Sequence, residues 1–314
     1  MSQVNTVLGP VDSKDLGFTL MHEHVMVVNH VMRSTFSEWI NQDNIIKQAV
    51  EDVLMAKKLG VQTIVDATPI NLGRDVSIIK EVSKQTGVHF IVSTGFYWTE
   101  EPWMLFWDPE AIAARVVQEV EKGIEGGDVK PNIIKAATEF NGMTLLNFKV
   151  LQIAGHLHLR TGLPITTHSA ARQEVGLMQL DVFESMGVDL SRVIIGHCGD
   201  TTDINYLEKI LKQGSYIGLD RFGLEDLLSS KLRIDTLVEL CRLGYEKQIV
   251  LSHDYCSFID WAPSRFLEEA NPLWHYKYLP QTIIPELRKR GVSDQKIQMM
   301  TIENPRRIFE SASA

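Results

Sequence analysis

Short apolar runs rich in β-branched residues recur along the whole chain and alternate with segments of helical periodicity. Most runs are continuously apolar, which is typical of strands buried on both faces of a parallel sheet. Between them, Asn44–Leu59 carries an apolar stripe that ends at Gly60, and Ile204–Gln213 follows Asp203 as a candidate N-cap. The eight predicted strands are Phe18–Val28, Thr63–Thr68, Phe90–Tyr97, Ile133–Glu139, Pro164–Ser169, Val193–Gly199, Ser215–Arg221 and Ile249–Asp254.

Eight strands separated by helical segments predict an α/β fold, a closed (β/α)₈ TIM barrel. Parallel neighbours need crossovers of a dozen residues or more, and each interval between the runs can hold one. The sequence has no low-complexity linker and no internal repeat, and its 314 residues suit one barrel. We therefore expect residues 1–314 to form a single domain.

The composition excludes several classes of partner. A formal net charge of −9 without a basic run argues against nucleic acids and anionic membrane surfaces. No segment approaches the roughly 18 apolar residues of a membrane span, and the polar first seventeen residues do not resemble a signal peptide. Three scattered cysteines, Cys198, Cys241 and Cys256, suit a reducing compartment. We expect a cytoplasmic protein that acts on a small molecule.

Metal-capable side chains stand at the ends of several predicted strands. His22 and His24 are two residues apart in one strand, so both imidazoles point to the same face. In a barrel, the carboxyl ends of the strands surround one pocket, and the further residues at such ends should meet this pair there. These further residues are Lys135, His168, His197 and Asp254.

Four imidazoles and a carboxylate exceed the ligands of one tetrahedral site, so the pattern predicts two divalent metal ions. Nitrogen-rich ligation favours zinc, with cobalt, iron or manganese as replacements. An ammonium group beside two dications is unfavourable, whereas a neutral Lys135 amine could add CO₂ and become an anionic, bridging carbamate. The sequence thus predicts N6-carboxylation of Lys135.

Such a centre indicates hydrolysis without a serine or cysteine nucleophile. A water shared by the two ions would act as hydroxide near neutral pH, and one ion would polarise the substrate's carbonyl or phosphoryl oxygen. Asp254 could bind one ion and accept the proton of the attacking hydroxide. The chain has neither a Gly-x-Ser-x-Gly elbow nor a phosphate-binding Gly-x-x-x-x-Gly-Lys loop.

Each of these residues also has a purely structural interpretation. An isolated His-x-His pair is more often packed than metal-bound, and His168 and His197 could be core histidines bonded to backbone carbonyls. Asp254 could be a helix N-cap, and Lys135 could pair with Glu139 or extend out of the barrel. A non-catalytic binding protein that kept the barrel is the corresponding functional alternative.

Several motifs together resemble the phosphotriesterase-like lactonases of the amidohydrolase superfamily. They are Gly-Phe-Thr-Leu-Met-His22-Glu-His24, Ile-Lys135, Thr-His168-Ser, Ile-Gly-His197-Cys-Gly-Asp-Thr, Ile-Gly-Leu-Asp-Arg221-Phe-Gly, Ser-His-Asp254-Tyr-Cys256, Ile-Asp-Trp261 and Glu-Asn304-Pro-Arg-Arg. The resemblance runs from about residue 7 to residue 311. The loops Glu100–Trp103 and Ser264–His275 do not identify one subgroup, so the size of the substrate stays open.

This resemblance implies a distorted barrel in which His22, His24 and Asp254 hold one ion and His168 and His197 hold the other, bridged by carboxylated Lys135. It implies catalytic and substrate-binding roles for Tyr97 and Arg221 beside the reacting groups, and an acyl-chain channel lined by Cys256 and Trp261. Homodimers are common in this family.

The activity that the resemblance implies is hydrolysis of lactones, often the N-acyl-homoserine lactones degraded in quorum quenching, with weaker phosphotriesterase activity. We expect apolar walls from two aromatic loops, Trp98–Trp107 and Tyr255–Leu279, which suit an acyl tail. A dedicated phosphotriesterase is the alternative.

Overall fold

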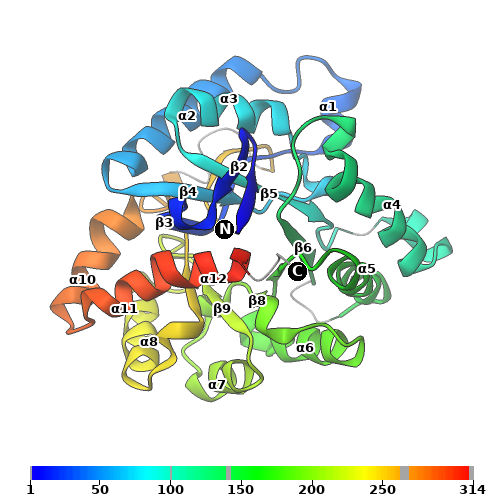
Figure 1. Cartoon of the computed structure of the whole chain (residues 1–314). Coiled ribbons are helices and arrows are strands. Elements are labelled where there is room, and N and C mark those ends of the chain that lie inside the picture. The colour runs from blue at the N-terminus through cyan, green and yellow to red at the C-terminus, as the bar shows by residue number, and fades with distance from the viewer. Residues whose placement is uncertain (1, 100, 139–142, 262–268, 311–314) are drawn as a thin grey trace.

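The computed structural model describes residues 2–99, 101–138, 143–261 and 269–310. All eight predicted strands are present in one parallel sheet of nine strands, in the order β10-β9-β8-β7-β6-β5-β4-β3-β11. The sheet curls into a barrel in the middle of the molecule (Figure 1). Its strands are β3 (Phe18–Val27), β4 (Val61–Asp66), β5 (His89–Gly95), β6 (Ile133–Ala137), β7 (Ile165–His168), β8 (Val193–Ile195), β9 (Tyr216–Leu219), β10 (Ile249–Leu251) and β11 (Cys256–Ile259).

The eighth strand is split into two parts, and this split closes the barrel. Its first part, β10, pairs with β9, while its second part, β11, pairs with β3, so that Cys256 lies beside His24. Between the two parts, Asp254 N donates to His22 O at 3.0 Å and His24 N donates to Tyr255 O at 2.8 Å. The prediction of an irregular Tyr255–Leu279 was wrong at its start, because β11 continues the sheet there.

Glu23 holds this closure together from inside the barrel wall. Its side chain is fully buried, and Oε1 accepts hydrogen bonds from Ser252 Oγ (2.8 Å), His253 N (3.0 Å) and His253 Nδ1 (2.6 Å). Oε2 accepts from Tyr255 N at 2.8 Å. A buried carboxylate is stable only when its oxygens are bonded. The segment that joins β10 to β11 therefore has one favourable position against β3.

Helices surround the barrel and supply the crossovers between its strands (Figure 1). As predicted, Asp203 caps the helix that follows β8, where its carboxylate accepts from Tyr206 N. A helix that the prediction lacked, α12, lies at the carboxyl end of the described chain. The α-helices are α1 (His30–Thr35), α2 (Gln42–Lys58), α3 (Val76–Thr86), α4 (Pro109–Lys122), α5 (Leu145–Thr161), α6 (Val175–Ser185), α7 (Ile204–Lys212), α8 (Ser230–Arg242), α10 (Ile284–Lys289), α11 (Asp294–Gln298) and α12 (Asn304–Glu310).

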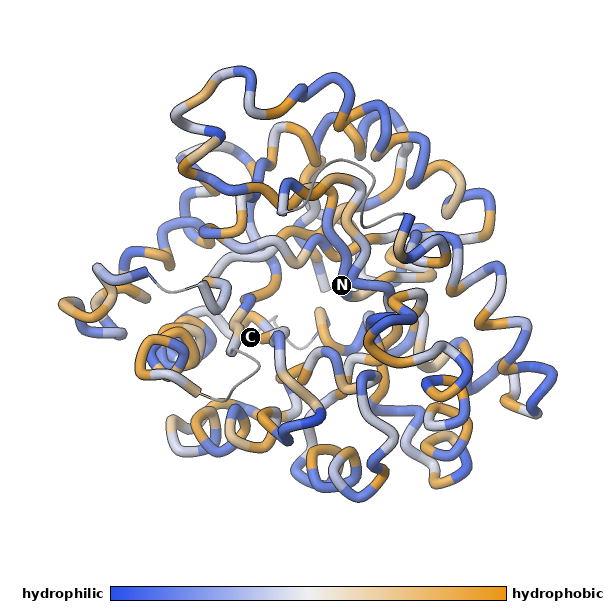
Figure 2. The backbone as a smooth tube through the Cα atoms, turned by 180° about the vertical axis from the view of Figure 1, so that it is seen from behind, coloured by the Kyte–Doolittle hydropathy of each residue, from blue (hydrophilic) through white to orange (hydrophobic). Residues whose placement is uncertain are grey.

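Two apolar clusters fill the molecule. The larger one lies between the strands and the helices, whose hydrophobic and hydrophilic positions alternate along each coil (Figure 2). The smaller one combines one residue from each of six strands with residues of the two chain ends. The antiparallel hairpin of β1 (Gln3–Thr6) and β2 (Gly9–Asp12), which the sequence did not predict, contributes Val4. This cluster closes one end of the barrel, so the polar site lies toward the other.

Within the described ranges, no helix has the length and apolar character that crossing a membrane requires. All three cysteines are unpaired and buried.

Candidate metal centre

The six predicted metal ligands lie close together in the barrel, within its strands or in the segments that follow them. They come from β3, β6 and β7 and from the segments directly after β8 and β10. Most are almost completely buried, and the Asp254 side chain is 14 % exposed. The sequence-based prediction that distant strand ends bring these residues together agrees with this geometry.

One half of the cluster is formed by His22, His24 and Asp254. The carboxylate atom Asp254 Oδ1 lies 3.1 Å from His24 Nε2 and 3.6 Å from His22 Nε2. Three such atoms within a few ångströms of each other form a group that could hold a metal ion.

His168 and His197 form the other half, and Lys135 lies beside His22. Lys135 Nζ lies 2.5 Å from His22 Nε2, and His197 Nε2 lies 2.9 Å from His168 Nδ1. The second carboxylate oxygen of Asp254 is 3.8 Å from His197 Nε2 and links the two halves. Ring nitrogens and the lysine amine thus all point into one small space.

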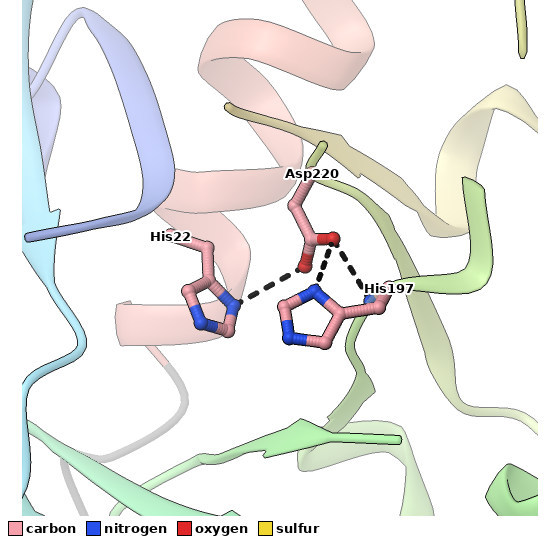
Figure 3. A group of neighbouring side chains, drawn as sticks. All are labelled: His22, His197 and Asp220. Atoms are coloured by element: carbon pink, nitrogen blue, oxygen red, sulfur yellow. Dashed lines mark hydrogen bonds and ion pairs between the residues drawn. The ribbon is translucent and has the colours of Figure 1, made fainter. Parts of the chain in front are cut away.

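Asp220 orients two of these imidazoles, and the sequence analysis missed it. Its carboxylate lies between the two rings, 2.9 Å from His197 Nδ1 and 3.2 Å from His22 Nδ1 (Figure 3). It also accepts from the backbone N of His197 at 2.8 Å. Gly218 leaves the necessary room, because a Cβ there would lie 2.4 Å from Asp220 Oδ2. With Nδ1 held in this way, each Nε2 faces the centre, as in metal sites where a carboxylate bonded to the far ring nitrogen orients the ligating histidine.

The protonation states suit metal binding. Burial, together with the nearby charge of Lys135, lowers the pKa of His22 to about 3. Burial, with the charge of His197, also holds the pKa of His168 well below its usual value. Burial opposes ionisation of Asp254, but the charges of His197 and Arg221 outweigh it and keep the pKa of this carboxyl well below its usual range. Near neutral pH the site therefore offers imidazole lone pairs and a carboxylate.

Lys135 is a buried lysine whose surroundings make its amine easier to deprotonate than usual. It is among the most deeply buried large side chains, and within the described residues it has no carboxylate at ion-pair distance. Burial lowers its pKa to about 8, although Asp254 and Asp220 act in the opposite direction. A neutral amine is the form that adds CO₂. The alternative partner Glu139 lies outside the described residues.

Two candidate ligands have unusual backbone conformations. His197 has φ 60° and Asp254 has φ 57°, the left-handed region that residues other than glycine rarely adopt. Such strain concentrates at functional sites. Asp254 is followed by β11 rather than by a helix, so the N-cap interpretation was wrong.

A cavity of about 220 Å³ opens on the cluster and contains the predicted substrate residues. Tyr97 Oη lies 3.5 Å from His168 Nδ1, and the Tyr97 ring faces Trp261 at a centroid distance of 6.1 Å. Burial, and the charge of Asp254, raise the pKa of the Tyr97 phenol, which therefore keeps its proton near neutral pH. The remaining walls are mostly apolar and include Val27, Leu72, Leu224, Leu227, Cys256, Ile259 and Trp274.

The two aromatic loops contribute less to this cavity than expected. Trp98 and Trp103 line a neighbouring cavity of about 860 Å³, not the one on the cluster.

In the loop after β11, Tyr276 is a core residue whose hydroxyl donates to His24 O at 2.7 Å, and Tyr278 is also buried. Phe266, another predicted wall residue, lies outside the described residues, as does Glu100. Among the described aromatic residues of the two loops, Trp261 and Trp274 line the cavity on the cluster.

Arg221 is already engaged by two carboxylates. Its Nε donates to Asp254 Oδ2 at 2.9 Å and its Nη1 donates to Asp200 Oδ2 at 2.8 Å. Asp200, which was not singled out from the sequence, follows His197 by three residues in the same strand-end motif. Arg221 therefore holds Asp254 in place and offers the cavity little uncompensated charge.

We expect the metal-depleted protein to lose stability as the pH falls. Because the pKa of His22 is lowered from 6.5 to about 3, the unfolded chain binds a proton in this window that the folded chain does not bind. The free energy of unfolding, measured in urea between about pH 7 and about pH 4, should therefore decrease. The substitution His22→Gln should make this dependence shallower, and an unchanged slope would contradict the assignment.

Comparisons with known proteins agree with this geometry. Residues 2–309 match the model of the phosphotriesterase family. The chain is 39 % identical over 320 residues to the phosphotriesterase homology protein of Mycobacterium tuberculosis, which covers 99 % of this chain and 98 % of that one. It is 36 % identical over 303 residues to the aryldialkylphosphatase of Saccharolobus solfataricus, with 95 % and 96 % covered. A solved structure of the phosphotriesterase from Mycobacterium tuberculosis superimposes with a TM-score of 0.94 at 38 % identity, covering 98 % of each chain. The chain is therefore a hydrolase and belongs to the phosphotriesterase family.

Proposed function

We propose that this chain is a cytoplasmic hydrolase that opens lactones, with weaker activity on phosphotriesters. The observation that carries the proposal is the mostly apolar cavity on the ligand cluster, whose one arginine, Arg221, is paired with Asp200 and Asp254 among the described residues. Such a cavity suits a neutral substrate with an apolar tail, for example an acyl-homoserine lactone or a γ- or δ-lactone, and disfavours phosphomonoesters. The unpaired cysteines support the cytoplasmic location.

The cofactor in this proposal is a pair of divalent cations, with zinc favoured by the imidazoles and cobalt, iron or manganese as replacements. His22, His24 and Asp254 would hold one ion, His168 and His197 the other, and carboxylated Lys135 would bridge them. Bound there, the pair would acidify a water molecule and polarise the carbonyl or phosphoryl oxygen of the substrate.

The side chains supply proton transfer and orientation. Asp254 would accept the proton of the attacking water, and Arg221 would keep this carboxylate ionised and in place. When a lactone ring opens, its ring oxygen leaves as an alkoxide, a poor leaving group that a hydrogen-bond donor stabilises. We assign this role to the Tyr97 hydroxyl, which is protonated and belongs to a residue that lines the cavity. Cys256 and Trp261 would contact the tail. The hydrogen-bond donor favours lactones over aryl phosphotriesters, whose phenolate leaves more easily.

A dedicated phosphotriesterase is the second candidate. The name of the Saccharolobus relative, aryldialkylphosphatase, favours it. The same cavity and the same ligands would serve both reactions, so the relative rates must decide between them.

Metal content tests the centre. The metal-loaded protein should contain two ions per chain, and Lys135→Ala should reduce this to about one and lower kcat/KM on the order of 10²-fold. Acetate or propionate should partly restore the activity of this variant, because a free carboxylate can replace the carbamate. Lys57→Ala, which removes a lysine bonded to Thr86 O, is the control and should keep both ions. Two ions and full turnover in Lys135→Ala would overturn the bridge.

Specificity constants on one metal-loaded preparation test the substrate class. We expect higher kcat/KM for acyl lactones than for paraoxon-type triesters. Tyr97→Phe should lower lactone hydrolysis about 10- to 100-fold and affect the aryl triester much less. The control Tyr245→Phe removes a surface hydroxyl bonded to Glu208 and should change neither. Absence of lactone turnover would reject the proposal, and a preference for triesters would favour the alternative.

A homodimer is also part of the proposal. Large apolar side chains are exposed around residues 102–107 and the start of α5, including Phe106 (87 %) and Leu145 (65 %). A face of this kind favours contact between copies of the chain. Light scattering should give twice the mass of one chain for the wild type and one chain for Phe106→Lys. Leu8→Lys, at an exposed site in the β1–β2 hairpin, should leave the mass unchanged. A monomeric wild type would contradict the proposal.

A further inference from the structure

Four buried charges form a continuous chain that starts at the candidate catalytic carboxylate. Arg221 joins Asp254 to Asp200, and Asp200 Oδ1 in turn accepts from Arg233 Nη2 at 2.7 Å. The side chain of Arg233, in α8, is 0 % exposed. Negative and positive groups alternate, so each charge has an opposite neighbour, as burial requires.

The far end of this chain holds one wall of the substrate cavity. Arg233 Nη1 donates to Leu224 O at 2.9 Å and also to Leu228 O. Leu224 and Leu227, from the segment Phe222–Ser229 that connects β9 to α8, line the cavity on the ligand cluster. We call this segment the β9–α8 wall. One guanidinium group thus connects the wall to the residue that positions Arg221.

A second arginine strengthens the same connection. Arg172 Nη2 donates to Leu227 O, and its Nε donates to the carbonyl of Asp200 at 3.4 Å. At the start of the wall, Gly223 packs so closely that a Cβ would lie 2.5 Å from Leu273 O. The wall is therefore attached at its beginning, middle and end, and Asp200 is the shared anchor of both arginines.

We infer that Arg233 is a positioning residue that sets the length of substrate tail accepted by the cavity, by holding the β9–α8 wall at a fixed distance from Asp254. It touches neither the candidate metal ligands nor the cavity. A planar guanidinium can serve Asp200 and two carbonyls at once, whereas a lysine amine lacks this fork geometry. The inference rests on the proposed function for the identity of the tail, not for the existence of the attachment.

The test compares Arg233→Lys and Arg233→Met with the wild type on acyl lactones of increasing chain length. An aryl phosphotriester series with alkyl groups of increasing length is measured in parallel. For lactones without a tail, kcat should stay within about 3-fold of the wild type, while for long tails KM should change by about 10-fold or more in the Met variant. The KM of Arg233→Lys for long tails should lie between those of the wild type and the Met variant.

The control is Arg74→Lys. Arg74 is also buried and bonded, to Glu119 and Ser93 O, but it does not contact Asp200 or the wall. It should keep the wild-type dependence on tail length even if it costs stability. An equal loss on every substrate in the Arg233 variants would show a merely structural role, and an unchanged profile would show that the wall is held without Arg233. Either result overturns the inference.

Hydrogen exchange of the metal-loaded protein gives a readout that needs no substrate. Backbone amides of residues 222–229 should exchange faster in both Arg233 variants and at the wild-type rate in Arg74→Lys. If the wild type hydrolyses triesters but not lactones, the proposed function fails while the triester series still tests the wall. Unchanged exchange in Arg233→Met would overturn the inference whatever the substrate.

Discussion

The bonding of Glu23 across the split eighth strand is the interaction on which the rest of the structure depends. Glu23 belongs to the same strand as His22 and His24, yet its carboxylate accepts four hydrogen bonds from residues 252–255. The segments that it joins are the first strand of the barrel, β3, and the connection between the two parts of the last strand. By fixing that segment it also fixes Asp254, since the backbone N of Asp254 donates to His22 O. The contacts that close the barrel therefore also bring Asp254 to His22 and His24.

Charge balance then decides what this centre can hold. Among the described residues, Asp254 and Asp220 are the carboxylates in contact with the imidazoles of the candidate ligands, and Asp254 is shared with Arg221. Two dications would bring four positive charges into a space where burial already disfavours charged groups. A lysine ammonium would add a fifth, whereas a carbamate would remove one and provide two oxygen atoms. This is the physical reason why the buried Lys135, an otherwise unfavourable residue in the middle of β6, belongs to the proposed metal site.

The sequence predicted the parts of this molecule that depend on local pattern. Continuous apolar runs identified all eight barrel positions, and because parallel strands end at one rim, His22, Lys135, His168 and Asp254 could be placed together without coordinates. Asp220 and Glu23 were missed because their roles depend on which distant groups they face, and periodicity carries no information on that. Asp220 directly follows β9 and precedes Arg221, but nothing in the sequence distinguished an orienting carboxylate from a surface one.

The parts that periodicity could not predict are those that shape the cavity. Trp98 and Trp103 of the expected aromatic wall line a different cavity, and two described aromatic residues after β11, Tyr276 and Tyr278, belong to the core. An aromatic ring can be buried in several orientations, so composition alone does not predict which cavity it lines. Ligands on strand ends have no such freedom, because the strand sets their direction. In this fold the reactive groups are therefore held by the sheet, while the shape of the cavity is held by long-range contacts such as those of Arg233. Substitutions of residues that make these long-range contacts can change which substrate fits the cavity without displacing any group that would carry out the reaction.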